Sequence, residues 1–262
     1  MKVKLILLRS VAFVLIAIIG YSGYQLWGIN QMHAQEAQIH SRLLHYKPVP
    51  LGSGPSISPA SSPYIAEPKL KPKPVLNQSI LDLQAEYNDV VGWLTIPGTQ
   101  IDYPFAQSND NDYYLHMDLD QNRSAAGTIF MDYRNSKDFS YFNTIIFGHN
   151  MRNGSMFGTL QDFNDRDFFD NNKTGTIFLA DRIYEIEFMA FAVIKPDDPV
   201  IFNTDIVRDI DKIAFLDYVK NAARHHRDID IGVASRDRVI TLSTCNYEFD
   251  NARMVIIGRI LQ

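Results

Sequence analysis

Residues 238–261 read RVITLSTCNYEFDNARMVIIGRIL, and this stretch decides how the chain folds near its carboxyl end. Two runs rich in β-branched and aliphatic residues are typical of strands. Cys245 ends the first run, and the seven residues NYEFDNA separate it from Arg253, which begins the second. So short a connection favours antiparallel pairing, which brings the end of one strand beside the start of the next. We therefore expect Cys245 and Arg253 to face each other.

Cys245 is the only cysteine among the 262 residues, so it has no partner for an internal disulfide. A buried cysteine is most often a small apolar residue with no chemical role. An arginine opposite a thiol can lower the pKa of that thiol or donate hydrogen bonds to an oxyanion. The alternative is that Arg253 covers a sheet edge or pairs with Asp250. Spacing alone leaves both interpretations open.

Six further strand-like runs precede this pair, each bounded by Gly, Pro, Asn or Asp. They are GWLTIPG (92–98), IDYPFAQ (101–107), GTIFMDY (127–133), NTIIFGH (143–149), GTIFLA (175–180) and IYEIEFMAFAVI (183–194). About eight short strands in one domain are typical of a closed barrel or a sandwich. Apolar residues at helical spacing in 79–91 and 208–228 predict added helices. The fold class is therefore mainly β with helices.

A cysteine nucleophile needs a partner for proton transfer, and histidine is the usual one. His149 follows a strand-like run and a glycine in TIIFGHNM, where a side chain is exposed at a strand end. His225 and His226 are expected near the carboxyl end of a helix, where positive charge is favourable for structural reasons. His116 lies in a loop and stays open, and the other three histidines precede residue 46. His149 is the strongest candidate.

Residues 5–27 form an almost unbroken apolar run, which is long enough for a membrane-spanning helix. Lys2, Lys4 and Arg9 precede the centre of the run, so we expect the amino end to stay in the cytoplasm. The predicted location is the cell membrane, with residues 1–29 as a single-pass anchor and the rest of the chain extracellular. A cleavable signal peptide is the alternative.

Composition divides the remainder into a linker and a head. Residues 47–76 hold eight of the twelve prolines, so we assign 30–76 to a stalk helix and a proline-rich extracellular linker. Residues 77–262 are enough for one globular domain. Of 25 basic residues three lie in the anchor, and the other 22 face 30 acidic ones, which argues against a nucleic-acid partner. No Cys and His cluster has metal-site spacing, so we expect no metal or other cofactor.

Several motifs together resemble the sortase family, the cell-surface transpeptidases of Gram-positive bacteria. TLSTC is followed eight residues after its cysteine by arginine, and FGHNM lies about a hundred residues upstream. The segments NDVVGWLTIPGTQIDYPFAQ, DYYLHMD, AAGTIFMDYRN and GSMFGTL are similar to class B sortases in order and spacing. The resemblance implies a sortase-type eight-stranded β-barrel with N-terminal helices and a long helix before the seventh strand.

The same resemblance implies a catalytic domain at 77–262 in which His149, Cys245 and Arg253 form the catalytic set and Ser243 binds substrate. The implied reaction cleaves a carboxyl-terminal sorting-signal peptide after threonine and forms a thioester on the cysteine. A peptidoglycan precursor or cross-bridge amine then takes the acyl group. The alternatives are a pilin-polymerising sortase, an extracellular cysteine peptidase, or a binding head without catalysis. The sequence does not distinguish the acceptors, the sorting motifs or the oligomeric states.

Overall fold

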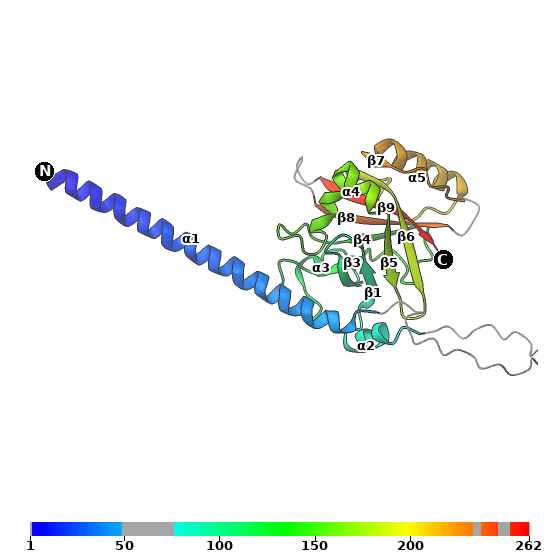
Figure 1. Cartoon of the computed structure of the whole chain (residues 1–262), viewed down its shortest axis with the longest axis horizontal. Helices are drawn as coiled ribbons and strands as arrows, with labels where there is room; N and C mark the ends of the chain where they lie inside the picture. The colour runs from blue at the N-terminus through cyan, green and yellow to red at the C-terminus, as the bar shows by residue number, and fades with distance from the viewer. Residues whose placement is uncertain (1, 49–75, 233–236, 246–251, 262) are drawn as a thin grey trace, which may run out of the picture. The chain divides into compact units, whose positions relative to one another are not determined.

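The computed structural model of the chain describes residues 2–48, 76–232, 237–245 and 252–261 (Figure 1). The strands are β1 (Val90–Thr95), β2 (Asp102–Ala106), β3 (Ile129–Met131), β4 (Asn143–Phe147), β5 (Thr174–Phe178), β6 (Ile183–Ile194), β7 (His225–His226), β8 (Arg238–Cys245) and β9 (Arg253–Leu261). The helices are α1 (Lys2–Leu43), η1 (Leu44–Tyr46), α2 (Gln78–Glu86), α3 (Tyr113–His116), η2 (Gly158–Asn164), α4 (Arg166–Asn171) and α5 (Asp209–Ala222). Each of the eight strands expected from the sequence is present.

Eight of these strands close into a barrel. Their order is β5-β1-β2-β3-β4-β8-β9-β6, and β6 pairs with β5 to complete the ring. Two pairs, β2 with β3 and β4 with β8, are parallel, and the other pairs are antiparallel. Closure leaves none of the eight strands at an open sheet edge. The expectation of a mainly β fold built on an eight-stranded barrel is confirmed.

Side chains alternate between two hydrophobic clusters along β8. Ile240 and Leu242 belong to the cluster that fills the barrel with residues of all its strands. Val239 belongs to a second cluster, in which Phe215 and Val219 of α5 cover the outside of the barrel. Figure 1 shows α5 outside the barrel near β6. The period-2 alternation of a strand therefore explains how β8 serves both clusters.

The first helix of the head is shorter than the sequence pattern indicates. A helix is predicted over 79–91, whereas α2 ends at Glu86. Val90 and Val91 lie in β1 instead, where Val90 pairs with Ala106 of β2. β-branched side chains fit the pleated surface of a sheet better than a helix, which explains the difference.

The inserted helix also ends early. Helical spacing extends over 208–228, but α5 ends at Ala222. His225 and His226 form β7, a two-residue strand that pairs with Phe191 and Ala190 of β6. The placement of these histidines at the end of a helix is therefore wrong. β5 pairs with β6 only as far as Glu187, so the backbone groups of Ala190 and Phe191 still need partners. Hydrogen bonding to them competes with continuation of the helix.

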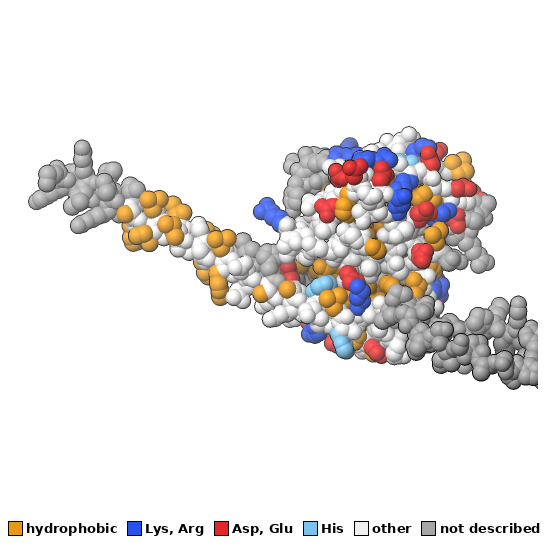
Figure 2. All heavy atoms as spheres, in the orientation of Figure 1, with side chains coloured by type: hydrophobic (Ala, Val, Ile, Leu, Met, Phe, Trp, Pro, Cys, Tyr) orange, Lys and Arg blue, Asp and Glu red, His pale blue; other side chains and the backbone are white. Residues whose placement is uncertain are grey.

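Residues 1–42 and 43–262 form two compact units. In the first, α1 is one continuous helix, and Figure 2 shows hydrophobic side chains on its surface. Phe13 and Trp27 are among the exposed ones. Within the described residues, no helix combines the length and the hydropathy needed to cross a membrane. The anchor expected at residues 1–29 stays a prediction.

The second unit includes residues that precede the proline-rich segment. Lys47 Nζ lies 2.6 Å from Asp102 Oδ2 at the start of β2. The Tyr46 hydroxyl donates to the Glu86 carboxylate at the end of α2. The proline-rich residues 49–75 lie outside the described part of the chain, and the predicted boundaries near 29 and 76 stay predictions.

Candidate active site

Three strand ends meet at one edge of the barrel. β4 runs parallel to β8, with Phe147 opposite Ser243, so the carboxyl ends of both strands lie at the same edge. β9 runs antiparallel to β8 and begins there, with Arg253 paired to Cys245. The expectation that Cys245 and Arg253 face each other across a strand pair is confirmed. Parallel and antiparallel pairing together thus gather residues from distant parts of the sequence.

His149 follows β4 at this edge. Gly148 donates its backbone N–H to the carbonyl of Ser243 at 3.2 Å, which continues the β4–β8 contact by one residue. A Cβ at Gly148 would lie 2.8 Å from the Phe157 ring, so only glycine allows this close approach. His149 Nε2 lies 2.7 Å from the carbonyl oxygen of Leu115. A carbonyl only accepts, so Nε2 carries the hydrogen and the ring orientation is set.

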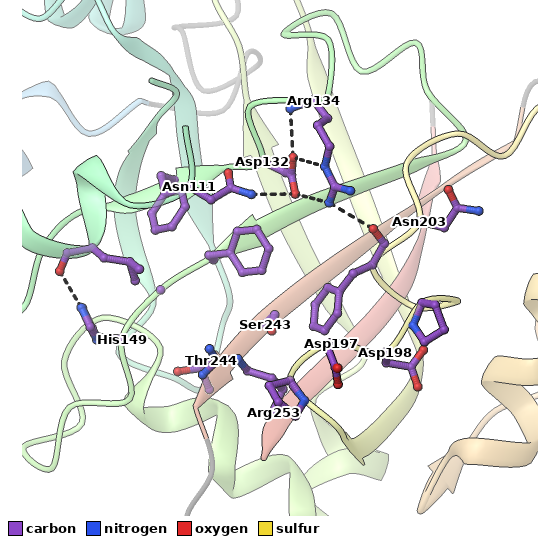
Figure 3. A pocket seen from close by; sticks show the side chains of 17 residues that line it. Asn111, Asp132, Arg134, His149, Asp197, Asp198, Asn203, Ser243, Thr244 and Arg253 are labelled. Carbon is purple, nitrogen blue, oxygen red and sulfur yellow. Dashed lines mark hydrogen bonds and ion pairs between the residues drawn. The ribbon is translucent and has the colours of Figure 1, made fainter. Parts of the chain in front are cut away.

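A cavity of about 470 Å³ opens at this edge. His149, Ser243, Thr244 and Arg253 line it from the ends of β4, β8 and β9. In Figure 3, His149 lies at one side of the cavity, with the other three side chains near its centre. Thr244 immediately precedes Cys245 in β8. The sequence-predicted residues His149, Ser243 and Arg253 therefore share one cavity, and the backbone of Cys245 is placed at its margin.

Two hydroxyl groups of this cavity have no hydrogen-bond partner within the described chain. Ser243 and Thr244 are 1% and 2% exposed, and neither side-chain oxygen makes a hydrogen bond there. A buried hydroxyl without a partner is unfavourable, and such groups are few in native structures. Both residues line the cavity, so a polar ligand there would lie close to these hydroxyl groups. This suits the substrate-binding role expected of Ser243, which stays a prediction.

One wall of the cavity is the connection from β6 to α5. The Asp198 carboxylate accepts the backbone N–H groups of Val200 and Ile201 at 3.0 and 2.8 Å. Tyr218 of α5 donates its hydroxyl to the same carboxylate at 2.6 Å, and this hydrogen bond raises the pKa of Tyr218. The neighbouring pair Asp197 and Asp198 has the sequence pattern of a solvated loop. For Asp198 that interpretation is wrong, because the residue is 7% exposed and its carboxylate is hydrogen-bonded within the protein.

The cavity also contains an ion pair that sequence reasoning missed. The Asp132 side chain is 0% exposed, and Arg134 Nη2 lies 2.7 Å from its Oδ2. This hydrogen bond to Asp132 raises the pKa of the Arg134 guanidinium. Asn111 donates its amide to the same carboxylate at 3.0 Å. The motif DYRN contained both charged residues, but only the fold reveals that they line this cavity.

The remaining candidate histidines of the head lie elsewhere. His116 has a side chain that is 63% exposed and lies 3.7 Å from Asp112. His225 contacts the carbonyl of Asn164 and packs against the Phe191 ring, which is a structural role. His226 lies beside Asp228, and burial lowers its pKa more than that carboxylate raises it. None of the three lines the cavity.

Comparison with known proteins identifies the family. The sequence profile described as Sortase domain matches residues 94–261. Sortase B of Listeria monocytogenes is 40% identical over 188 residues, which cover 71% of this chain and 75% of that protein. The structure of a mutant form of Clostridium perfringens sortase B matches with a TM-score of 0.66 and 30% identity, covering 71% of this chain and 87% of that one.

A third match is a Streptococcus pyogenes class B sortase whose structure is described as that of a protein involved in pilus biogenesis. Its TM-score is 0.63 at 32% identity, and the match covers 69% of this chain and 96% of that one. Fold, strand order and sequence similarity agree over the barrel. The chain therefore belongs to the sortase family of transpeptidases, and within it to the class B sortases.

Proposed function

We propose that this sortase cleaves a carboxyl-terminal sorting signal after threonine and joins the new carboxyl end to a peptidoglycan amine. In this proposal Cys245 is the nucleophile, His149 transfers protons and Arg253 stabilises the oxyanion. The observation that carries it is the register at the barrel edge. Phe147 pairs with Ser243 and Cys245 with Arg253, so the three strand ends that hold these residues converge on one cavity.

The first half-reaction forms a thioester. The Cys245 thiolate attacks the threonine carbonyl carbon, and the carbonyl oxygen takes up negative charge. Arg253 donates hydrogen bonds to that oxygen. The carbon–nitrogen bond then breaks, and protonated His149 gives its proton to the departing amine. The products are the released carboxyl-terminal peptide and an acyl group on Cys245.

The second half-reaction transfers the acyl group. The acceptor amine attacks the thioester carbonyl, and neutral His149 takes the proton that the nitrogen loses. The new amide bond forms as the carbon–sulfur bond breaks, which returns the thiolate and the protonated imidazole. One histidine therefore serves as acid and then as base, as microscopic reversibility requires.

The hydrogen bond of His149 indicates which ring nitrogen transfers the proton. Nε2 donates to the Leu115 carbonyl, and that bond is compatible with both the neutral and the protonated ring. Nδ1 has no hydrogen-bond partner within the described chain, although His149 lines the cavity. We assign proton transfer to Nδ1, with Leu115 holding the ring in place.

The location of the enzyme is part of the proposal and rests on the sequence. The apolar run at 5–27 follows Lys2 and Lys4, a pattern that favours an amino end in the cytoplasm and an extracellular head. Sorting-signal peptides and wall amines would then be accessible on the same side of the membrane. A protease-protection assay on intact cells tests this topology, and digestion only after lysis would contradict it.

A lysine of a pilin subunit is the second candidate acceptor. What favours it is the similarity to the Streptococcus pyogenes class B sortase described as involved in pilus biogenesis. The chemistry at Cys245 is the same for either amine. The acceptor therefore has to be identified by product analysis.

Intact-mass spectrometry of the full-length protein tests the reaction. The protein is incubated with peptides carrying Asn-Pro-x-Thr-Asn or Pro-x-Thr-Gly signals, with and without a glycyl or lysyl amine. We expect an acyl adduct on Cys245 that the amine discharges into a joined product, and no adduct on the Cys245→Ala protein. An adduct that only water discharges would identify a cysteine peptidase instead. No adduct with any peptide, while iodoacetamide still labels Cys245, would contradict the proposal.

A further inference from the structure

Asp132 and Arg134 form an ion pair that lines the cavity. Asp132 follows β3, and its buried carboxylate accepts from Arg134 Nε at 2.9 Å and from Nη2 at 2.7 Å. The backbone N–H of Arg134 also donates to it, at 2.9 Å. Two parallel hydrogen bonds from one guanidinium fix both position and angle, which a single contact does not. The pair is therefore a rigid unit.

This unit holds Asn111 on one side of the cavity. Asn111 Nδ2 donates to Asp132 Oδ2 at 3.0 Å, and its Oδ1 accepts the backbone N–H of Tyr133 at 3.1 Å. An ionised carboxylate only accepts, so the amide nitrogen, and not the oxygen, must face Asp132. The carboxylate thus decides which way the Asn111 amide presents its atoms to the cavity.

The same unit holds another wall. Arg134 Nη2 donates to the carbonyl oxygen of Phe202 at 3.1 Å. The Phe202 ring lies 5.9 Å from the Phe147 ring, which lies 5.4 Å from the Phe130 ring, so three aromatic side chains line the cavity side by side. Figure 3 shows the hydrogen bonds running from Asn111 through Asp132 to Arg134, and the bond from Arg134 to the Phe202 carbonyl extends this chain. One ion pair therefore connects two segments 91 residues apart in sequence.

A role in stability alone does not explain this arrangement. Burying a carboxylate is costly, and a well-packed apolar pair often stabilises a fold as well as a buried ion pair does. Here the remaining side-chain hydrogen bonds of the pair go to Asn111 and to the Phe202 carbonyl, on two walls of the cavity. We propose that Asp132 and Arg134 are positioning residues that set the separation of these walls and thereby the affinity for the sorting-signal peptide. This inference rests on the proposed function.

Neither residue of the pair takes part in the proposed chemical steps. The pair therefore acts through its hydrogen bonds to Asn111 and Phe202. Its loss should therefore weaken peptide binding and leave the nucleophile intact. Misplacement of binding groups by about 1 Å can cost up to about a hundredfold in rate. We expect a fall of roughly tenfold in kcat/KM for the peptide, expressed in KM and not in kcat.

The test uses Arg134→Lys, which keeps the positive charge beside Asp132 but loses the two parallel hydrogen bonds, and Asp132→Asn, which keeps the shape. Arg208→Lys is the matched control. Arg208 also makes two hydrogen bonds to a carboxylate, that of Asp211, both at 2.7 Å, yet it lies on the surface outside the cavity. Thermal unfolding confirms that each protein is folded.

Three measurements then separate positioning from a general structural defect. They are the KM values for peptide and amine, the rate of Cys245 alkylation by iodoacetamide, and the Kd of a labelled peptide for each variant combined with Cys245→Ala. Both cavity variants should weaken peptide binding about tenfold, with the amine KM and the alkylation rate unchanged. Arg208→Lys should match the wild type.

An unchanged peptide Kd in both cavity variants would overturn the positioning role. An equal loss in Arg208→Lys, or a fall in alkylation rate that accompanies the loss of binding, would overturn it as well. Failure of the proposed function is recognised separately, because the wild-type protein would then bind the peptide without forming any joined product. Direct measurement of Kd keeps the two questions apart.

Discussion

Thr241 and Ser243 lie two residues apart on β8, and both are buried, at 0% and 1% exposure. The Thr241 hydroxyl donates to Asn143 Oδ1 at 2.9 Å. The Ser243 hydroxyl has no partner within the described chain. Of these two hydroxyl groups on one strand, the one in the middle of β8 is therefore hydrogen-bonded, and the one nearer the edge of the barrel is not bonded within the described residues. Buried polar groups that are satisfied maintain the fold, whereas an unpaired one beside a cavity calls for a further explanation, such as a bound ligand.

His149 has one ring nitrogen that is hydrogen-bonded within the described chain and one that is not. Its substitution has the largest expected effect, which is on kcat. Nε2 donates to the Leu115 carbonyl, and Nδ1 has no hydrogen-bond partner among the described residues. His149→Gln can retain an amide donor toward that carbonyl but cannot carry a proton, so we expect kcat to fall roughly a thousandfold. The free energy of unfolding should change by less than about 1 kcal/mol. Steady-state kinetics and denaturant unfolding measure the two effects.

The control for that experiment is His116→Gln, since His116 is mostly exposed and lies outside the cavity. It should leave both kcat and stability unchanged. Activity of His149→Gln within tenfold of the wild type would remove His149 from the proposed mechanism.

Asn143 is the most completely bonded member of the satisfied group. Its Nδ2 donates to the carbonyls of Ile201 and Asn203 at 2.9 and 3.0 Å, and its Oδ1 accepts from Thr241. Asn143→Ala leaves two buried groups, the Ile201 carbonyl and the Thr241 hydroxyl, without this partner, and we expect a loss of about 3 kcal/mol in the free energy of unfolding. Urea denaturation tests this, with Asn109→Ala at an exposed position as the control. Equal stabilities of the two variants would contradict the importance of this network.

Three isosteric substitutions sharpen the comparison further. Thr241→Val removes a hydrogen bond and leaves Asn143 Oδ1 unpaired, which should cost about 1 to 2 kcal/mol. Thr244→Val removes a hydroxyl that has no partner within the described chain, so stability should change by less than about 0.5 kcal/mol while peptide turnover falls. Thr144 is also buried, and its hydroxyl likewise has no partner within the described chain, but this residue does not line the cavity.

Thr144→Val should therefore change neither stability nor turnover. Parallel unfolding and kinetic measurements on the three proteins decide the matter. A loss of turnover in Thr144→Val equal to that in Thr244→Val would mean that the cavity position of Thr244 is irrelevant.

Asp102 gives a small predicted effect on stability that depends on pH. Burial raises the pKa of this carboxyl, but hydrogen bonds from Lys47, Trp93 and Thr95 outweigh that and lower it. Because the folded-state pKa is below the unfolded value of about 3.9, the stabilisation is complete above that value and is lost as pH falls through the folded pKa. The side chain is partly exposed, so we expect no more than about 1 kcal/mol.

Asp102→Asn removes this titration. The difference in unfolding free energy between the wild type and Asp102→Asn should therefore shrink as pH falls from about 5 to 3. A difference that grows on acidification would reverse the assigned sign.

The sequence predicted what depends on local pattern. β-branched and aromatic runs located all eight barrel strands, and the short connection after Cys245 was sufficient to pair it with Arg253. The end of α2 was placed too late, because helical spacing alone does not reveal that Val90 pairs with Ala106 in the sheet.

The walls of the cavity could not be predicted in this way. Asn111, Asp132 and Phe202 come from three segments that only the closed barrel brings together. Asp198 has the sequence context of a solvated loop residue, since its partner Tyr218 belongs to a helix whose orientation the sequence does not give. Long-range hydrogen bonds of buried polar groups carry no periodic signal, whereas hydrophobic faces do.

The pH dependence of kcat/KM for a sorting-signal peptide tests the central claim most directly. If Cys245 and His149 act as a coupled thiolate and imidazolium, one must lose a proton and the other must keep one, so the profile has two limbs. We predict a bell-shaped profile for the wild type and the loss of one limb in His149→Gln. A flat profile between about pH 6 and 9 would contradict the assignment of these two residues as nucleophile and proton carrier.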